Sequence, residues 1–283
     1  MTDPMEIRYK AIVFLALSAI LWSFGGLFIK LVSWNPMAIA GLRSLIAVLV
    51  LLAYVRHPRF TWSFPQMGGA IAYAVTVTLF VLATRLTTAA NAILLQYTAP
   101  IYVALLGSWF LGERAEWFDW ISILILIGGI ALFFLDHLTV GNLLGNGFAI
   151  LSGISFACLV LFLRKQKNES PIGSIMLGNL LTGLVGLPFM FDSMPGALSW
   201  AGLLFLGVVQ LGLSYVLYSE AIKHVTALEA ILIPGIEPIL NPIWVFFILG
   251  EKPGKWALIG GFIVLISVTL RSLIAIRRRD RPS

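Results

Sequence analysis

The feature that most constrains this chain is a series of long, uninterrupted apolar runs. Each run is about 18 residues or longer, enough for a helix to cross the ~30 Å hydrocarbon core of a bilayer. None shows the polar stripe of a helix that covers a water-soluble core. They predict ten transmembrane helices, at 11–29, 37–55, 67–84, 89–111, 117–135, 143–163, 172–190, 198–218, 226–249 and 255–276.

The composition agrees with a bilayer as the solvent. Apolar residues make up 59% of the 283 positions and charged residues only 11%, about half the charged share of a soluble domain. So few charges cannot cover a water-exposed surface. We therefore predict an all-α integral membrane protein.

The basic residues are distributed unevenly between the two sides of the predicted bundle. If the N-terminus is cytoplasmic, four basic residues fall outside: Lys30, Arg85, Lys252 and Lys255. The larger inside set is Arg8, Lys10, Arg56, Arg59, Arg114, Arg164, Lys165, Lys167, Lys223, Arg277, Arg278, Arg279 and Arg281. This positive-inside bias predicts a multi-pass protein of a bacterial inner membrane with both termini cytoplasmic. We expect the basic tail to contact anionic lipid and not nucleic acid.

The two halves of the chain resemble each other. A shift of 138 residues aligns Pro100 and Leu111-Gly112-Glu113 with Pro238 and Leu249-Gly250-Glu251, and a shift of 134 aligns Ser18 with Ser152. Chance likeness between apolar helices is the alternative. Each half, 1–138 and 139–283, holds five predicted helices. Because five is odd, the second half enters the membrane from the opposite side, which predicts two inverted repeats of the kind found in secondary transporters.

The same residues carry a family resemblance. The sequence resembles the ten-helix EamA-type exporters of the drug/metabolite transporter superfamily, among them the exporters of aromatic and neutral amino acids. The resemblance implies two inverted five-helix repeats around a central cavity lined by helices 1, 3, 4, 6, 8 and 9. The matching residues are Trp22, Lys30, Pro36, Arg43, Pro100, Gly112-Glu113, Gly128-Gly129, Gly141, Gly145, Pro238 and Gly250-Glu251.

Polar and aromatic side chains recur on corresponding helices of the two halves. Because lipid offers no partner to a hydroxyl or an amide, such side chains should face the bundle or a wet cavity. Helix packing is the alternative. The candidate substrate-binding residues are Ser18, Trp22, Tyr73, Thr76, Phe80, Gln96, Tyr97, Ser152, Phe156, Gln210, Ser214, Tyr215, Tyr218, Glu237 and Asn241.

Prolines interrupt the fourth and ninth predicted helices. Pro100 frees the carbonyl of Gln96, and Pro234, Pro238 and Pro242 repeat that loss in the ninth helix. Freed carbonyls near the membrane centre are acceptors for a substrate ammonium group, and interrupted helices at matching positions indicate a transport site. A kink that serves only packing or gating is the alternative.

Two charged residues lie inside predicted helices. Glu237 is the favoured functional residue; it could accept a substrate ammonium, carry a proton, or bond to backbone and Asn241 as a structural carboxylate. Arg43 could hold a substrate carboxylate, but the family resemblance makes it a scaffold residue that caps neighbouring carbonyls.

Motifs for other chemistries are missing from the sequence. The histidines at 57, 137 and 224 have no carboxylate or cysteine at metal-ligand spacing, and Cys158 is the single cysteine. Gly254-Lys255 lacks the upstream glycine of a phosphate-binding loop, because position 249 is Leu. We expect no metal, cofactor, nucleotide or nucleic-acid partner, and no enzymatic activity.

These observations favour a monomeric secondary transporter that exports aromatic and other neutral amino acids by alternating access. A zwitterion needs acceptors for its ammonium, donors for its carboxylate and an apolar slot for its side chain. The alternative within transport is an exporter of lipophilic cations, drugs or other small metabolites. A membrane-embedded enzyme or receptor would need a catalytic constellation or a soluble domain, and the sequence shows neither. Proton coupling and downhill export both remain open.

Overall fold

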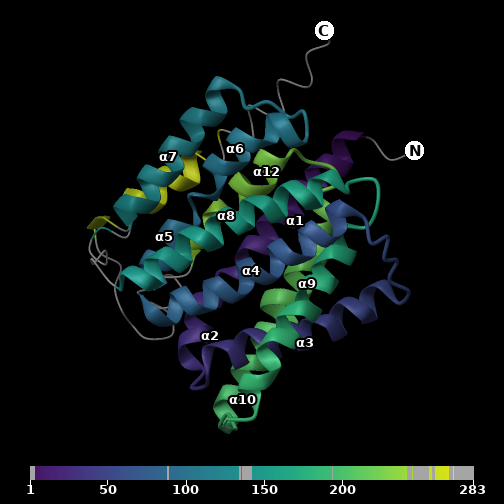
Figure 1. Ribbon diagram of the computed structural model, residues 1–283. Helices are drawn as coiled ribbons and strands as arrows, with labels where there is room; N and C mark the ends of the chain where they lie inside the picture. The colour runs from purple at the N-terminus through teal and green to yellow at the C-terminus, as the bar shows by residue number, and fades with distance from the viewer. Residues whose placement is uncertain are drawn as a thin grey trace.

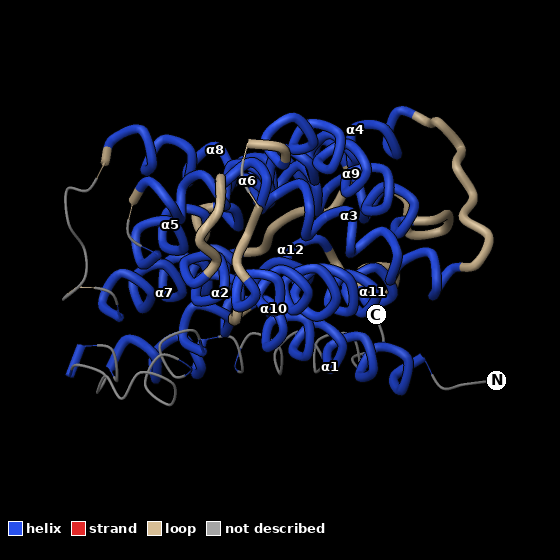
Figure 2. Tube along the Cα trace, turned by 90° about the horizontal axis from the view of Figure 1, so that it is seen from below, coloured by secondary structure: helices blue, strands red, loops and turns tan. Residues whose placement is uncertain are grey.

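The computed structural model describes residues 4–87, 89–133, 135, 142–192, 194–240, 244, 255–256, 259–267 and 270. Throughout these residues the regular elements are helical, and no strand occurs among them (Figures 1 and 2). The predicted all-α class therefore holds for the described part of the chain.

The helices follow one another with short connections. In chain order they are α1 Pro4–Trp22, α2 Gly25–Leu31, α3 Pro36–Val55, α4 Phe64–Leu86, α5 Ala89–Gln96, α6 Ala99–Phe110, α7 Trp117–Phe133, α8 Leu143–Lys165, α9 Pro171–Gly186, a 3-10 turn η1 Leu187–Met190, α10 Ala197–Phe205, a π-helical segment η2 Leu206–Leu213, α11 Ser214–Ala221, α12 Ala227–Leu232 and a 3-10 turn η3 Ile233–Ile236.

Seven described segments are long and apolar enough to span a membrane. They are 5–31, 36–55, 64–86, 91–110, 143–165, 171–190 and 197–221, and a shorter apolar helix covers 117–132. These eight match the first eight predicted runs to within a few residues, except that the first begins earlier. Much of the predicted runs 226–249 and 255–276 lies outside the described residues. The chain is a multi-pass membrane protein.

Polar caps fix where several helices begin. Asn35 accepts a hydrogen bond from the amide of Met37 ahead of α3, and Ser63 accepts one from the amide of Gln66 ahead of α4. Each is followed by a proline within the first helical turn, where the missing N–H is not needed. At α12, Thr226 and Glu229 form a reciprocal capping box. The loops between spans thus encode the helix starts.

Helices far apart in the sequence pack side by side. α4 lies along α8 and α9, and α3 packs against α9 (Figure 1). α1 packs against α11. At the crossing of α3 and α9 the backbones meet directly: a Cβ added to Gly186 would lie 2.6 Å from the Cα of Gly41 and 2.6 Å from the carbonyl oxygen of Met37. Small residues permit this approach, as is usual between membrane helices.

Three of the seven spans are interrupted, and a fourth break lies in the predicted run 226–249. α1 gives way to α2 at Ser23 and Phe24, and α5 to α6 at Tyr97 and Thr98. The segment η2 separates α10 from α11, and η3 follows α12. A distant residue stabilises the break between α1 and α2: the indole of Trp244 stacks on Phe24 and donates a 2.7 Å hydrogen bond to the Ser23 hydroxyl.

Two arginines toward the helix ends form ion pairs. Arg8 of α1 pairs with Glu229 of α12, and Arg164 near the end of α8 donates to Glu113 at 2.7 Å. The other Glu113 oxygen accepts from the amide of Ala227 at 2.8 Å. These contacts tie α1, α8 and the loop after α6 to the beginning of α12, and they leave each charge compensated.

The Gly41–Gly186 crossing yields a stability prediction. We expect Gly186→Ala to destabilise the protein by about 1–3 kcal/mol, because the added methyl meets backbone atoms that cannot move aside. The melting temperature of the purified protein in detergent measures this. Gly147→Ala is the matched control, since a Cβ there meets nothing within 4 Å and replaces a helical glycine by a better helix former. Equal melting temperatures for the two variants would contradict the close approach.

Candidate functional site

The interrupted helices converge on a cavity of about 50 Å³ inside the bundle. This is far smaller than the ~300 Å³ or more of a pocket that holds a drug-sized ligand. An amino acid with a large side chain would enter only if the walls moved apart. The lining residues are Trp22, Arg43, Thr76, Val77, Phe80, Gln96, Phe156, Gln210, Leu211, Tyr215 and Glu237.

Most of the polar lining residues sit where a helix is irregular. Trp22 is the last residue of α1 and Gln96 the last of α5. Gln210 lies in the π-helical segment η2, and Glu237 follows η3 directly. Irregular backbone is tolerated at membrane depth only where protein or water covers it, and π-helical segments often occur at functional sites. The irregularities thus gather at one place.

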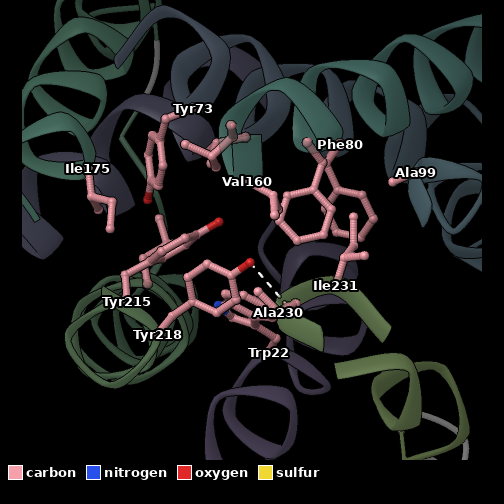
Figure 3. Packing of buried hydrophobic residues seen from close by; sticks show 14 of the residues in the cluster. Trp22, Tyr73, Phe80, Ala99, Val160, Ile175, Tyr215, Tyr218, Ala230 and Ile231 are labelled. Atoms are coloured by element: carbon pink, nitrogen blue, oxygen red, sulfur yellow. Dashed lines mark hydrogen bonds between the residues drawn. The ribbon is translucent and has the colours of Figure 1, made fainter. Parts of the chain in front are cut away.

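Aromatic rings form one wall of the cavity. The Trp22 ring lies 6.0 Å from Phe156 in an edge-to-face arrangement, 5.1 Å from Tyr215 and 5.0 Å from Tyr218. Tyr73 lies 4.9 Å from Tyr215. Figure 3 shows Trp22, Tyr215 and Tyr218 gathered on one side, with Phe80 across the gap and Tyr218 bonded to the Ala230 carbonyl. Such a wall suits an apolar or aromatic ligand group.

Glu237 lines the same cavity and has one hydroxyl contact. The hydroxyl of Tyr97 lies 2.8 Å from a carboxylate oxygen of Glu237 and also 2.8 Å from the carbonyl oxygen of Pro234. Pro238 has no N–H to donate to that carbonyl, and the backbone amide of Glu237 donates to it instead, so it is not the free acceptor that the sequence predicts. No cation lies within ion-pair distance of Glu237 among the described residues.

Arg43 brings a second charge to the same cavity. Its side chain is 1% exposed, and its two terminal nitrogens donate to Oε1 of Gln210 at 3.2 Å and to the carbonyl of Val77 at 3.4 Å. Gly25 makes room for Gln210, because a Cβ there would lie 3.0 Å from Nε2 of Gln210. The Nε atom of Arg43 and the indole nitrogen of Trp22 have no hydrogen-bond partner in the described part of the protein.

Eight of the fifteen candidate substrate-binding residues line the cavity. They are Trp22, Thr76, Phe80, Gln96, Phe156, Gln210, Tyr215 and Glu237. Six lie behind its walls: Ser18, Tyr73, Tyr97, Ser152, Ser214 and Tyr218. Asn241 lies outside the described residues, as does Pro242 among the four prolines. Pro100 begins α6, Pro234 lies in η3, and Pro238 occupies the helical turn after it.

Apart from Tyr97, whose hydroxyl also contacts Glu237, the hydroxyls behind the walls bond to backbone carbonyls or side-chain amides. Ser18 donates to the carbonyl of Ser214 at 3.0 Å, and Ser152 donates to the carbonyl of Thr76 at 3.0 Å. Ser152 also accepts a 2.8 Å hydrogen bond from the amide of Gln96. Tyr73 bonds to Asn179. In this structure these groups join helices to one another.

Sequence reasoning assigned Arg43 to the scaffold, whereas the structure places it both at the cavity wall and against the Val77 carbonyl. Its position as the one charge within the run 37–55 is a sequence feature that could have placed it with Glu237. Val77 and Leu211 also line the cavity and were not expected, because apolar residues carry no comparable mark. The described residues contain no cluster of three or more potential metal ligands.

Three named proteins are similar to this chain in sequence. An archaeal protein from Archaeoglobus fulgidus, named "Uncharacterized transporter", is 28% identical over 258 residues, covering 90% of this chain and 94% of its own. The pseudopaline exporter CntI of Pseudomonas aeruginosa is 26% identical over 186 residues, 63% of this chain and 64% of its own. A protein of Streptantibioticus cattleyicolor named "Probable terminal-alkyne amino-acid exporter" is 26% identical over 206 residues, 69% and 68% respectively.

A solved crystal structure shares the fold. It superposes with a TM-score of 0.80 over 97% of this chain and 100% of its own, at 18% sequence identity. The sequence profile of the EamA-like transporter family matches residues 9–135 and again residues 143–273. These two matches together span most of the sequence, and the family consists of transporters and not of enzymes. The chain therefore belongs to the EamA-like transporter family.

Proposed function

We propose that the protein is a secondary transporter that exports aromatic and other neutral amino acids across the bacterial inner membrane. The observation that carries the proposal is the central cavity, which is lined both by the aromatic rings of Trp22, Phe156 and Tyr215 and by the carboxylate of Glu237. The wall suits an apolar side chain, and the carboxylate suits an ammonium group. The name of the Streptantibioticus relative supports an amino-acid substrate.

Alternating access follows from two inverted repeats, 1–138 and 139–283. One support is that the family profile matches the chain twice. The other is the reciprocal pair of hydrogen bonds from Ser18 to Ser214 and from Ser152 to Thr76. The two donors, Ser18 and Ser152, are equivalent under the shift of 134 residues between the halves, and the two acceptors, Thr76 and Ser214, are equivalent under the shift of 138. Each half thus uses its first helix to hold the third helix of the other, as a two-fold axis requires.

A second cavity supports entry from the cytoplasmic side. It measures about 460 Å³ and lies between the first turns of α1 and the ends of α3 and α11. Lys10, Tyr54, Glu220 and His224 line it, and this end of the bundle is the one that the basic residues assign to the cytoplasm. In this proposal the transporting unit is the monomer.

An exporter of lipophilic cations is the second candidate function. It is favoured by the same carboxylate and aromatic rings, which form an environment that attracts cations. Counterflow in liposomes loaded with tryptophan or with an organic cation separates the two functions. Accumulation of labelled tryptophan supports amino-acid export, and accumulation of the cation alone supports the alternative.

Glu237 yields the first functional prediction. Glu237→Gln keeps the size of the side chain and removes its charge, so an ammonium group loses a charge-assisted contact of about 1.5–3 kcal/mol. We expect tryptophan counterflow to fall by about 10-fold or more, with unchanged membrane insertion and melting temperature. Glu169→Gln, the same change on an exposed loop, is the control. Wild-type transport by the Glu237 variant would reduce this carboxylate to a structural role.

The inverted repeats predict opposite positions for the two Leu-Gly-Glu loops. In a variant whose single cysteine Cys158 is replaced by Ser, we introduce Arg114→Cys or Lys252→Cys. A membrane-impermeant maleimide added to intact cells should label the cysteine at 252 and not the one at 114, because five helices separate equivalent points of the two repeats. Lysed cells, in which both should react, provide the control. Labelling of both cysteines in intact cells would rule out the inverted arrangement.

A further inference from the structure

Arg43 is a buried cation with no acidic partner among the described residues. It lies in the middle of the span Pro36–Val55 and is 1% exposed, and none of the ion pairs among the described residues includes it. Removing a charge from water costs several kcal/mol unless an opposite charge or several good hydrogen bonds replace the water. By contrast, Arg8 and Arg164 have carboxylate partners. The interior therefore favours an anion beside Arg43.

The hydrogen bonds that Arg43 makes leave part of its donor capacity unused. A guanidinium carries five N–H donors, and the two contacts to Gln210 and Val77, at 3.2 and 3.4 Å, are longer than the 2.7–2.9 Å of a strong charge-assisted bond. Its Nε has no partner among the described residues. Neither does the indole nitrogen of Trp22, a residue only 5% exposed that lines the same cavity.

We propose that Arg43 and the indole N–H of Trp22 bind the carboxylate of the transported substrate, with Gln210 positioning the guanidinium. A planar guanidinium matches the two oxygens of a carboxylate, and an indole N–H adds a neutral donor. Because Glu237 lines the same cavity, a bound zwitterion would place one charge near each of the two unpaired side chains. The inference rests on the proposed function and narrows it: a carboxylate becomes a requirement, and lipophilic amines without one are excluded.

A purely structural role is the competing explanation. The contacts of Arg43 with Gln210 and with the carbonyl of Val77 join α3 to η2 and to α4, so loss of the side chain is expected to lower stability whether or not it binds substrate. Stability alone cannot decide between the two roles. The ratio of affinities for ligands that differ in one charged group can, because unfolding lowers all affinities together.

The test uses three ligands that share an indole ring. L-Tryptophan carries both charges, tryptamine lacks the carboxylate, and indole-3-propionate lacks the ammonium. Their dissociation constants are measured by scintillation proximity or tryptophan-competition assays on the purified full-length protein in nanodiscs. The proteins compared are the wild type, Arg43→Gln, Arg43→Lys and Glu237→Gln.

We expect wild-type protein to bind tryptophan at least about 10-fold more tightly than tryptamine. Arg43→Gln should weaken tryptophan and indole-3-propionate by about 10-fold or more and leave tryptamine within about two-fold. Arg43→Lys should fall between, since an ammonium keeps the charge without the fork. Glu237→Gln should show the opposite selectivity and weaken tryptophan and tryptamine together.

Each other outcome is decisive. If the wild type binds tryptamine as tightly as tryptophan, and Arg43→Gln changes neither affinity, the substrate needs no carboxylate. The inference about Arg43 is then overturned, and export of cations is supported. If the wild type binds indole-3-propionate but not tryptophan, and Arg43→Gln weakens that binding, the carboxylate contact is supported and amino-acid export is rejected. A uniform loss of all three ligands in Arg43→Gln assigns Arg43 to the scaffold, and failure of folded wild-type protein to bind any of the three overturns both proposals.

Discussion

The lack of hydrogen-bonding solvent in the bilayer core determines where this protein can depart from regular helix. Each interruption of a span exposes backbone groups that lipid cannot satisfy. The breaks between α1 and α2 and between α5 and α6, together with η2 and η3, each contain buried residues, among them Ser23, Tyr97, Gln210 and Ile233. Their convergence places Trp22, Gln96, Gln210 and Glu237 around one small cavity. The location of the site follows from backbone satisfaction as much as from the side chains.

Much of the architecture could be predicted from sequence because it depends on long-range averages. The first eight apolar runs predicted the seven spans and the shorter helix 117–132 to within a few residues, except for the earlier start of α1. Pro100 marked the break between α5 and α6. The break at Ser23 and Phe24 could not be predicted in the same way, since no proline lies there and the support comes from Trp244, more than 200 residues away. The π-helical segment η2 likewise has no local sequence mark.

The site was harder to predict because a hydroxyl in a membrane helix can serve a carbonyl or a ligand equally well. Ser18 and Ser152 lie on the expected faces, yet they bond to carbonyls on partner helices. Large aromatic and amide side chains such as Trp22, Phe156 and Gln210 do reach the cavity. Arg43 bonds to a backbone carbonyl and also lines the cavity. The sequence treated a scaffold role and a binding role as alternatives, but one side chain can have both.

The position of Tyr97 links the occupant of the cavity to the backbone of the ninth span. A phenol has a single hydrogen, and here two acceptors lie at the same 2.8 Å from its oxygen, the Pro234 carbonyl and Glu237. Only one of them can receive that hydrogen at a time. A ligand that donates to Glu237 would leave the phenol hydrogen to the Pro234 carbonyl, which already accepts from the amide of Glu237. Binding at the carboxylate would therefore change the hydrogen bonding of the backbone in η3.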